Sequence, residues 1–324
     1  MIIGLTYDLK SEYLKEGFSA EETAEFDKEE TIAGIEDALQ ELGYATQRIG
    51  HIRQLAARLV SGDRWDMVFN ICEGMYGIGR EAQVPAILDA YKIPYTFSDP
   101  MVLSLTLHKG MTKRVVRDAG LSTPDFALVE EEKDIAGIAL PFPLFVKPYA
   151  EGTGKGIDAS SKVTSREELE RRCRALLPQY KTGLIVERFL PGREFTVALA
   201  GTGAATRSLG TMEVMFTEKA EAHGYSYLNK EDYVGRVNYR IVDDETAGQC
   251  AELAISAWQA LNCRDAGRID LRLDHHGKPG FIEVNPLAGL NPIHSDLPII
   301  CRLQGISYVE LIGMIMDSAM SRIG

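Results

Sequence analysis

The sequence lacks the cysteine patterns that mark disulfide-rich or zinc-binding proteins. Its five cysteines are odd in number and widely spaced, and no two of them form a CxxC pair. These features argue against a disulfide framework and against a zinc site. We expect all five to be reduced residues that pack in the interior: Cys72, Cys173, Cys250, Cys263 and Cys301.

The chain also lacks long apolar runs and an excess of basic residues. No run approaches the length of a membrane span, and residues 1–9 are too short and have no basic start for a signal peptide. We therefore expect a cytoplasmic protein without a membrane partner. Lysine and arginine number 35 against 47 acidic residues, a net charge of −12. This balance argues against a nucleic-acid partner, because phosphate backbones require clustered basic side chains.

Much of the negative charge lies in one segment near the N-terminus. Residues 8–30 contain nine acidic residues and three lysines, which gives a net charge of −6. A charge run of this kind is most often a solvated or mobile loop. One of its last acids could still face the amino group of a substrate.

Residues 1–105 alternate between strand and helix patterns. Three short apolar strands, at residues 1–6, 45–49 and 67–72, are separated by stretches with helical spacing. This alternation predicts an α/β unit with a parallel sheet covered by helices. A Gly-rich turn at residues 73–79 could hold a phosphate, but it matches neither GxGxxG nor a Walker A loop, so a plain turn is the preferred interpretation.

A second unit, starting near Thr106, combines a lysine with a Gly-rich loop. Lys147 stands near the end of the apolar strand at residues 142–148, and glycines occupy every second position of the loop at residues 151–156. The N–H groups of such a loop could cover phosphates. Each feature alone is weak, but together they could supply a cation and a lid for a nucleoside triphosphate.

Two hairpins are predicted further along the chain. The first pairs residues 184–189 with 194–200, and the second pairs residues 268–274 with 281–285. In the second hairpin the alternation of side chains gathers four polar residues on one face: Arg268, Asp270, Glu283 and Asn285. Three oxygen ligands beside a guanidinium suit Mg²⁺ that holds phosphates. An ordinary hairpin with a charged, solvated face has the same alternation, but here the hairpin runs directly into a rigid Pro- and Gly-rich loop.

Several segments together resemble the successive motifs of the ATP-grasp superfamily, and within it most closely the D-alanine–D-alanine ligase family. In chain order they are Phe145-Val146-Lys147-Pro148, residues 151–156, residues 187–197, Gly267-Arg268-Ile269-Asp270 and residues 281–286. The likeness spans nearly the whole chain. It implies an α/β (α+β lobes) ATP-grasp fold with an N-terminal parallel-sheet (preATP-grasp) domain at residues 1–105. A central lobe with the lid would span residues 106–184, and a C-terminal lobe with the metal-binding hairpin would span residues 185–324.

The resemblance implies an ATP site between the two lobes. Lys109 and Lys147 would contact the phosphates, residues 187–190 would line the adenine pocket, and Glu194 would hold the ribose hydroxyls. Lys109 could instead be a surface residue at a helix N-terminus, and Glu187 a solvent-facing strand residue. The residues expected to bind ATP are Lys109, Lys147, Glu151, Gly152, Gly154, Glu187, Arg188, Phe189, Leu190 and Glu194, with a looser match at Tyr225, Tyr227 and Lys230.

The resemblance also implies the metal ligands and the reaction. Mg²⁺, which Mn²⁺ can replace, would be held by Asp270, Glu283 and Asn285. ATP would phosphorylate a carboxylate to an acyl phosphate, and an amine would then attack the carbonyl and release phosphate. The expected catalytic residues are Arg268, which would steady the reacting carboxylate, Thr153 in the lid, and Glu30; the expected substrate-binding residues are Gly289, Leu290 and Ser295.

The departures from the family all concern the amino-acid side of the site. The glutamate that binds the first ammonium group is missing from residues 4–8, and Glu30 is our candidate substitute. Glu231 stands where the family has a tyrosine. Ser295 matches the family serine only if one residue is inserted, and His294 beside it is either a packing residue or a ligand. D-Alanine is therefore expected to be at most a modest substrate unless the acidic segment folds over the site.

Three functions remain open at this point. The protein could join D-alanine to D-alanine, or use the same chemistry on another amino acid, a hydroxy acid or a peptide in a biosynthetic pathway. A substrate with an extra cationic group is one such alternative. The protein could also bind ATP without turnover, although its intact metal and phosphate residues favour an active ligase. A homodimer is an assembly that the resemblance allows.

Overall fold

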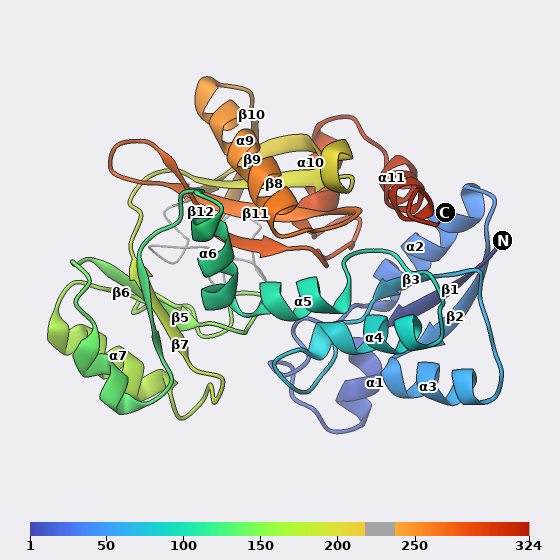
Figure 1. Ribbon diagram of the computed structural model, residues 1–324, viewed down its shortest axis with the longest axis horizontal. Coiled ribbons are helices and arrows are strands. Elements are labelled where there is room, and N and C mark those ends of the chain that lie inside the picture. The colour runs from blue at the N-terminus through green and yellow to red at the C-terminus, as the bar shows by residue number, and fades with distance from the viewer. Residues whose placement is uncertain (218–236, 324) are drawn as a thin grey trace.

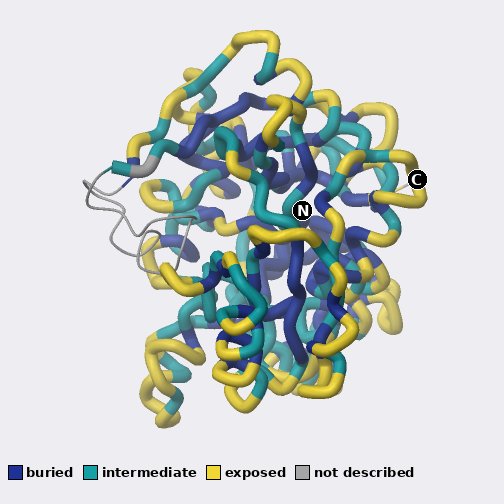
Figure 2. Tube along the Cα trace, turned by 90° about the vertical axis from the view of Figure 1, so that its left-hand side faces the viewer, coloured by how far each residue is buried: buried dark blue, intermediate teal, exposed yellow. Residues whose placement is uncertain are grey.

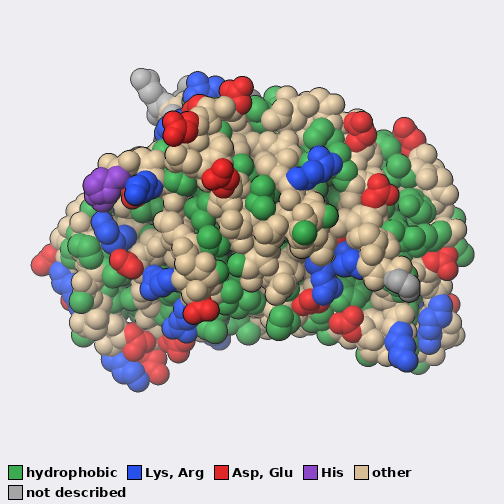
Figure 3. All heavy atoms as spheres, turned by 45° about the horizontal axis from the view of Figure 1, so that its top comes forward, with side chains coloured by type: hydrophobic (Ala, Val, Ile, Leu, Met, Phe, Trp, Pro, Cys, Tyr) green, Lys and Arg blue, Asp and Glu red, His purple; other side chains and the backbone are tan. Residues whose placement is uncertain are grey.

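The computed structural model describes residues 1–217 and 237–323, which form three sheets. Figure 1 shows the N-terminal sheet at the right, the central sheet at the lower left and the C-terminal sheet above. Charged side chains of both signs are interspersed over the face in Figure 3. The mixture of one parallel and two antiparallel sheets confirms the predicted α/β class with α+β lobes.

The N-terminal sheet is parallel, as the alternation of strands and helices predicts. Its strand order is β2-β1-β3. The strands are β1 (Ile2–Tyr7), β2 (Ala45–Gly50) and β3 (Met67–Ile71), and the helices of this region are α1 (Lys10–Lys15), α2 (Glu29–Glu41), α3 (Ile52–Val60), η1 (Arg80–Ala82) and α4 (Gln83–Ala90). Ile32, Ile35 and Leu39 recur at helical spacing on α2 and are almost completely buried. Burial of this apolar face therefore holds α2 against the sheet.

The central sheet is antiparallel and has the strand order β4-β7-β5-β6. Its elements are β4 (Phe126–Val129), η2 (Glu132–Gly137), β5 (Leu144–Pro148), β6 (Lys162–Val163), α7 (Arg166–Leu176) and β7 (Leu184–Arg188). Leu169 and Cys173 of α7 pack with Leu144 and Val146 of β5 in one apolar cluster. This packing covers one face of the sheet and leaves Lys147 on the opposite face.

The hairpin predicted from residues 184–189 and 194–200 is wrong. β7 pairs with β4 and β5 in the central sheet, whereas β8 (Glu194–Ala200) pairs with β9 and β11 in the C-terminal sheet. Between β7 and β8 the chain passes from the central sheet to the C-terminal sheet. Gly192 lies in this connection, and its N–H donates to the carbonyl of Leu273. A Cβ at Gly192 would lie 2.8 Å from that carbonyl oxygen, so the close approach requires glycine. The expected lobe boundary at 184/185 thus falls at the start of a strand that belongs to the central sheet.

The C-terminal sheet is antiparallel and has the strand order β10-β9-β8-β11-β12. The remaining elements are η3 (Gly203–Ala205), β9 (Arg207–Phe216), β10 (Val237–Val242), β11 (Ala266–Leu273), β12 (Pro279–Asn285), α5 (Pro100–Leu107), α6 (Lys109–Asp118), α9 (Glu245–Ala260), α10 (Asp296–Leu303) and α11 (Tyr308–Met320). β11 and β12 form the predicted second hairpin, which is confirmed. Trp258 of α9 is fully buried against this sheet, where a Cβ on Gly267 would lie 2.6 Å from the indole.

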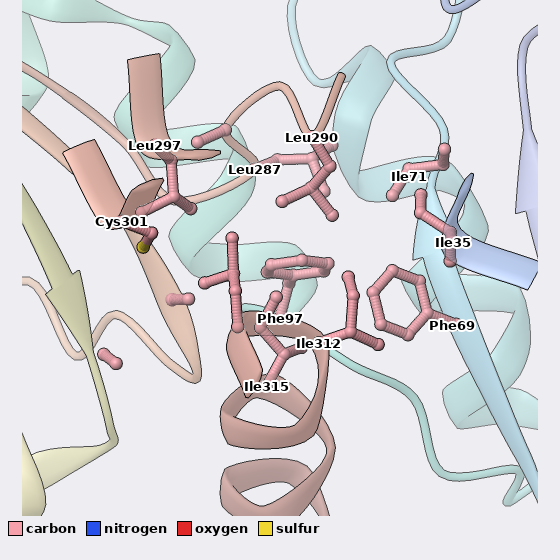
Figure 4. Close-up of a cluster of buried hydrophobic side chains, with 14 of the residues drawn as sticks. Ile35, Phe69, Ile71, Phe97, Leu287, Leu290, Leu297, Cys301, Ile312 and Ile315 are labelled. Atoms are coloured by element: carbon pink, nitrogen blue, oxygen red, sulfur yellow. The ribbon is translucent and has the colours of Figure 1, made fainter. Parts of the chain in front are cut away.

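One apolar core joins the N-terminal sheet to the C-terminal helices. Ile35 and Phe69 from the N-terminal unit lie close to Ile312 and Ile315 of α11 (Figure 4). Leu290, from the loop after β12, is buried in the same cluster. In Figure 2 the buried residues, in dark blue, lie in the interior of the molecule. The loop after β12 is therefore anchored by the core on one side.

The cysteine prediction is confirmed, since all five cysteines are free and buried. In the described ranges, no single helix is long and apolar enough to cross a membrane. α10 and α11 are long and apolar enough only when taken together, and the two are bent by 114° relative to each other.

Candidate active site

Two pockets adjoin between the sheets. The first pocket lies between the central sheet and the β11–β12 hairpin. All of the residues expected to bind ATP that the structure describes line it: Lys109, Lys147, Glu151, Gly152, Gly154, Glu187, Arg188, Phe189, Leu190 and Glu194. Tyr225, Tyr227, Lys230 and Glu231 lie outside the described residues.

The second pocket lies between the N-terminal unit and the loop after β12. Of the residues predicted for catalysis, substrate or metal, it is lined by Thr153, Arg268, Glu283, Asn285, Gly289 and Ser295. It shares Lys109, Glu151, Gly152 and Glu283 with the first pocket. The two pockets therefore meet at these residues.

Leu290 does not reach the second pocket. Its side chain is 1% exposed in the core, and its carbonyl accepts a hydrogen bond from the Tyr308 hydroxyl at 2.8 Å. Ser295 accepts a bond from the Asn291 N–H at 3.0 Å. The Asn291 side-chain oxygen also accepts from the backbone N–H of His294 at 3.0 Å. These bonds fix the shape of the loop that presents Gly289.

A buried group of charges forms one wall of the first pocket. The Glu187 carboxylate lies 3.0 Å from the Lys147 Nζ and 2.9 Å from the Lys113 Nζ. Glu187 is 3% exposed and Lys109 is 9% exposed. The alternative positions, a surface lysine at a helix N-terminus and a solvent-facing glutamate, are therefore wrong. Burial raises the pKa of Glu187, but the two lysines outweigh it and leave the pKa below its usual value. The carboxylate is therefore ionised.

Lys113 is a member of this group that sequence reasoning missed. It is completely buried and donates to the Thr123 hydroxyl at 3.0 Å and to the Phe281 carbonyl at 3.1 Å. Burial lowers the pKa of Lys113 to about 8. Its position four residues after Lys109, on the same face of α6, is the sequence signal that could have found it.

Two lysines and a carboxylate stand where the pockets meet. The Lys109 Nζ lies 3.6 Å and the Lys147 Nζ 3.8 Å from the same oxygen of Glu283. Lys109 also donates to the Glu151 carbonyl at 2.6 Å. Burial lowers the pKa of Lys109, whereas for Lys147 the carboxylates of Glu187 and Glu283 outweigh burial and raise it. The junction is thus a compact site for anionic oxygens.

The β11–β12 hairpin brings its polar residues onto one surface, as the alternation predicts. Asp270 faces Glu283, and Arg268 faces Asn285 in the antiparallel register. Arg268 forms an ion pair with Asp270, and the Thr196 hydroxyl donates to Asp270 at 2.9 Å. The Arg268 Nε lies 3.6 Å from Asp296, a neighbour that the sequence pattern did not reveal. Arg268 is thereby held in place at the edge of the second pocket.

The three predicted metal ligands suit a hard cation that keeps other ligands of its own. Within residues 1–217 and 237–323, no three histidine, cysteine or acidic side chains come together as a metal site. The predicted set has only two carboxylates, Asp270 and Glu283, and one amide, Asn285. Such a sparse oxygen set is typical of Mg²⁺, which usually fills its remaining positions with water and phosphate oxygens.

The structure does not bring Glu30 to either pocket. It lies exposed on the first turn of α2, because the helix turns its apolar face to the core. Two other acids of the same segment, Glu25 and Asp27, line the second pocket instead. The Glu30 assignment is therefore corrected.

The acidic segment exposes many of its residues, as a solvated segment would, but it is folded and tied to the N-terminal unit. Its ends are tied by backbone bonds, from Lys10 N–H to the Asp27 carbonyl at 2.9 Å and from Asp27 N–H to the Asp8 carbonyl at 3.1 Å. Tyr13 and Phe26 pack with ring centroids 4.5 Å apart, and Phe26 is 6% exposed. The aromatic residues within the acidic run were the signal that this segment folds.

The Gly-rich turn at residues 73–79 has no helical or strand structure, as expected for a plain turn. Gly74 N–H donates to the Asp8 carboxylate at 2.9 Å. The first residue of the turn and the two residues after it nevertheless contribute to the site, because Glu73, Arg80 and Glu81 line the second pocket.

A charged contact holds the Gly-rich loop after β5 against the N-terminal unit. The Glu25 carboxylate accepts from Gly152 N–H and from the Arg80 guanidinium, both at 2.8 Å. Arg80 also donates to the Ala150 carbonyl at 3.0 Å. Burial raises the pKa of Glu25, but Arg80 and Lys155 outweigh it and lower the pKa below its usual value. The ionised carboxylate thus joins the acidic segment to the loop that lines both pockets.

Loss of the Glu25 charge should loosen this loop. We expect Glu25→Gln to speed amide hydrogen exchange over residues 150–157 by roughly tenfold or more, because a charge-assisted bond is replaced by a weaker one. Glu30→Gln, a matched change on an exposed residue of the same segment, should leave the exchange unchanged. Mg²⁺ with a non-hydrolysable ATP analogue should slow exchange in the wild type. Equal exchange in wild type and Glu25→Gln would refute the role of this contact.

Comparisons with known proteins agree with these features. A family model described as D-ala D-ala ligase C-terminus matches residues 115–317. A D-alanine–D-alanine ligase of Bordetella petrii is 32% identical over 294 residues, covering 90% of this chain and 86% of the relative. The corresponding ligase of Aquifex aeolicus is 30% identical over 288 residues, covering 88% and 93% of the two chains.

Solved structures share the fold over nearly the whole length. The D-alanine–D-alanine ligase of Bacillus anthracis complexed with ATP covers 99% of this chain and 98% of its own, with a TM-score of 0.72 at 20% identity. The VanG D-Ala:D-Ser ligase of Enterococcus faecalis covers 98% and 99%, with a TM-score of 0.75 at 18% identity. The resemblance read from the motifs is confirmed, and the chain belongs to the D-alanine–D-alanine ligase family, whose members are ATP-dependent, ADP-forming carbon–nitrogen ligases of the ATP-grasp fold.

Proposed function

We propose that this protein joins a carboxylate to an amine at the meeting point of its two pockets, with ATP in the first and amino-acid substrates in the second. The observation that carries the proposal is that both pockets share Lys109 and Glu283. A terminal phosphate held at this junction would face a carboxylate in the second pocket. Because both reacting groups are held in place, the entropy cost of bringing them together is already met by binding. This positioning is a large part of catalysis for such reactions.

The first pocket offers suitable surfaces for each part of ATP. Phe145, Phe189 and Leu190 provide apolar walls for the base, and Glu194 offers acceptors for ribose hydroxyls. Lys109 and Lys147 supply positive charge for the phosphates. Asp270, Glu283 and Asn285 would hold Mg²⁺, which would neutralise charge on the transferred phosphoryl group. In the nucleotide-bound state the two lysines would exchange part of their contact with Glu283 for phosphate oxygens.

The reaction proceeds in two steps. A carboxylate oxygen of the first substrate attacks the γ-phosphorus, ADP leaves, and an acyl phosphate remains. The amine nitrogen of the second substrate then attacks the carbonyl carbon, phosphate leaves, and a proton is released as the amide forms. Arg268 and the backbone N–H groups near Gly289 would stabilise the negative oxygen of the tetrahedral intermediate. The contact between Glu25 and the Gly-rich loop would exclude water, which would otherwise hydrolyse the acyl phosphate.

A coupled assay of ADP release over D- and L-amino acids, supplied singly and in pairs, tests this proposal. We expect at least one amino acid or pair to raise ADP release far above the rate with ATP alone, and the release to require Mg²⁺. D-Alanine is the reference substrate, because the relatives are D-alanine–D-alanine ligases. If no amino acid raised the rate over ATP alone, a ligase function would be contradicted.

A further inference from the structure

Carboxylates outnumber basic side chains around the second pocket. Its acidic lining residues are Glu25, Asp27, Glu73, Glu81, Glu151, Glu283 and Asp296, and its basic ones are Lys28, Arg80, Lys109 and Arg268. The pocket itself is identified independently of these acids, by its junction with the first pocket at Lys109 and Glu283. The charge of its lining therefore informs the charge of the substrate.

Most of these charges are already engaged. Arg80 pairs with Glu25, and Lys109 lies beside Glu283. Arg268 is shared between Asp270 and Asp296. Of the four basic lining residues, Arg80, Lys109 and Arg268 thus already form ion pairs with carboxylates, and Lys28 is exposed.

Three carboxylates of the pocket are left over. Asp27, Glu73 and Glu81 have no lysine or arginine nitrogen within 4.0 Å among residues 1–217 and 237–323. Glu73 begins the Gly-rich turn and Glu81 follows it, and Asp27 is fixed by its backbone bonds to Lys10 and Asp8. Among the described residues, the fold therefore holds three carboxylates at the pocket wall that form no ion pair, and only the more distant Arg80 and Lys109 offset the charge of Glu73 and Glu81.

Placing these carboxylates without ion-pair partners disfavours their ionised forms, and their pKa values are raised. Burial raises the pKa of Asp27 to about 7 and that of Glu81 to about 7. Burial also raises the pKa of Glu73, and the neighbouring carboxylates of Glu81 and Glu25 add to the effect. Asp8 raises the pKa of Asp27 further, and Asp27 raises that of Glu73; Arg80 lowers the pKa of Glu73 and Glu81, and Lys109 lowers that of Glu81, but neither outweighs burial. A bound cation would remove much of this cost, because it stabilises the ionised carboxylates.

We propose, resting on the proposed function, that the second pocket takes a diamino acid, whose two ammonium groups lie among Asp27, Glu73 and Glu81. A single α-ammonium group, as in alanine, would bring one positive charge to three carboxylates. A second ammonium group on the side chain matches the excess charge more closely. The substrate class is therefore an amino acid with a cationic amine on its side chain.

Calorimetric titration of the full chain with matched amino acids tests this inference. Lysine and norleucine, and ornithine and norvaline, have side chains of the same carbon skeleton with and without the terminal amine. Both enantiomers are titrated at pH 8 in the presence of MgADP. We expect at least one diamino acid to bind tenfold or more tightly than its neutral counterpart, since each charge-assisted bond contributes roughly a factor of ten.

Two single variants assign the preference to the pocket. Glu73→Gln and Glu81→Gln each keep the size of the side chain, and each should reduce the preference for the diamino acid several-fold. Glu30→Gln should leave it unchanged. Thermal unfolding of each variant confirms that it is folded, and because the two variants are independent, either one alone keeps the test valid.

The outcomes separate this inference from the proposed function. Equal binding of the neutral and diamino acids, or binding of neither, would overturn the inference, and efficient ADP release with a neutral amino acid would then leave the ligase function intact. A preference for a diamino acid that both Gln variants reduce would support the inference. If that preference came without ADP release from any substrate pair, the inference would stand and the proposed function would fail.

Discussion

Glu283→Gln is expected to lower the rate of ADP release by roughly two to three orders of magnitude while the protein stays folded. Glutamine keeps the size of the side chain but removes the carboxylate that lies between Lys109 and Lys147. The predicted Mg²⁺ site would lose one of its two negative ligands, so the Mg²⁺ concentration at half-maximal rate should rise as well. Initial rates of ADP release over a Mg²⁺ titration give both quantities.

The matched control for this substitution is Glu252→Gln. Glu252 is exposed on α9, in the same C-terminal unit as Glu283. Its replacement should change neither the rate nor the Mg²⁺ dependence. A near-normal rate of ADP release in Glu283→Gln would show that the metal assignment is mistaken.

The second large effect concerns stability. We expect Lys113→Met to lower the free energy of unfolding by about 3–5 kcal/mol, because breaking a buried ion pair leaves charge without compensation. Methionine has a similar length, but it cannot donate to Thr123, Phe281 or Glu187. Glu187 would keep only Lys147 as a partner. Urea unfolding at pH 7, followed by circular dichroism, measures the loss.

Lys133→Met provides the comparison for an exposed ion pair. Lys133 lies 2.6 Å from Glu131, but the two side chains are 75% and 64% exposed. Surface pairs contribute about 0–1 kcal/mol, so this variant should be close to wild type in stability. If the two variants lost the same free energy, the Lys113 ion pair would not be a major stabilising element.

Features that depend on local periodicity could be predicted from the sequence. The β11–β12 hairpin places Asp270 opposite Glu283, as the alternation of polar and apolar residues requires. The parallel N-terminal sheet follows from alternating strands and helices in the same way. In both cases the pattern of a few neighbouring residues decides which face is buried.

Features that depend on distant contacts could not be predicted. Lys113 meets the Phe281 carbonyl across 168 positions of the chain, and no local pattern marks such a contact. β7 and β8 are adjacent in sequence and suited to a hairpin, yet each pairs with strands of a different sheet. Similarly, the acid content of residues 8–30 did not reveal that Glu25 and Asp27, rather than Glu30, line the pocket, because this depends on how the segment folds back onto the N-terminal sheet.

The central claim is that a carboxylate in the second pocket is phosphorylated by ATP from the first, and the fate of the carboxylate oxygens tests it most directly. The substrate that gives the fastest ADP release is supplied with oxygen-18 in its carboxylate, and the released phosphate is followed by phosphorus NMR. The account predicts that one labelled oxygen enters phosphate for each ADP and each amide bond formed. Unlabelled phosphate, or ADP released without a joined product, would contradict it.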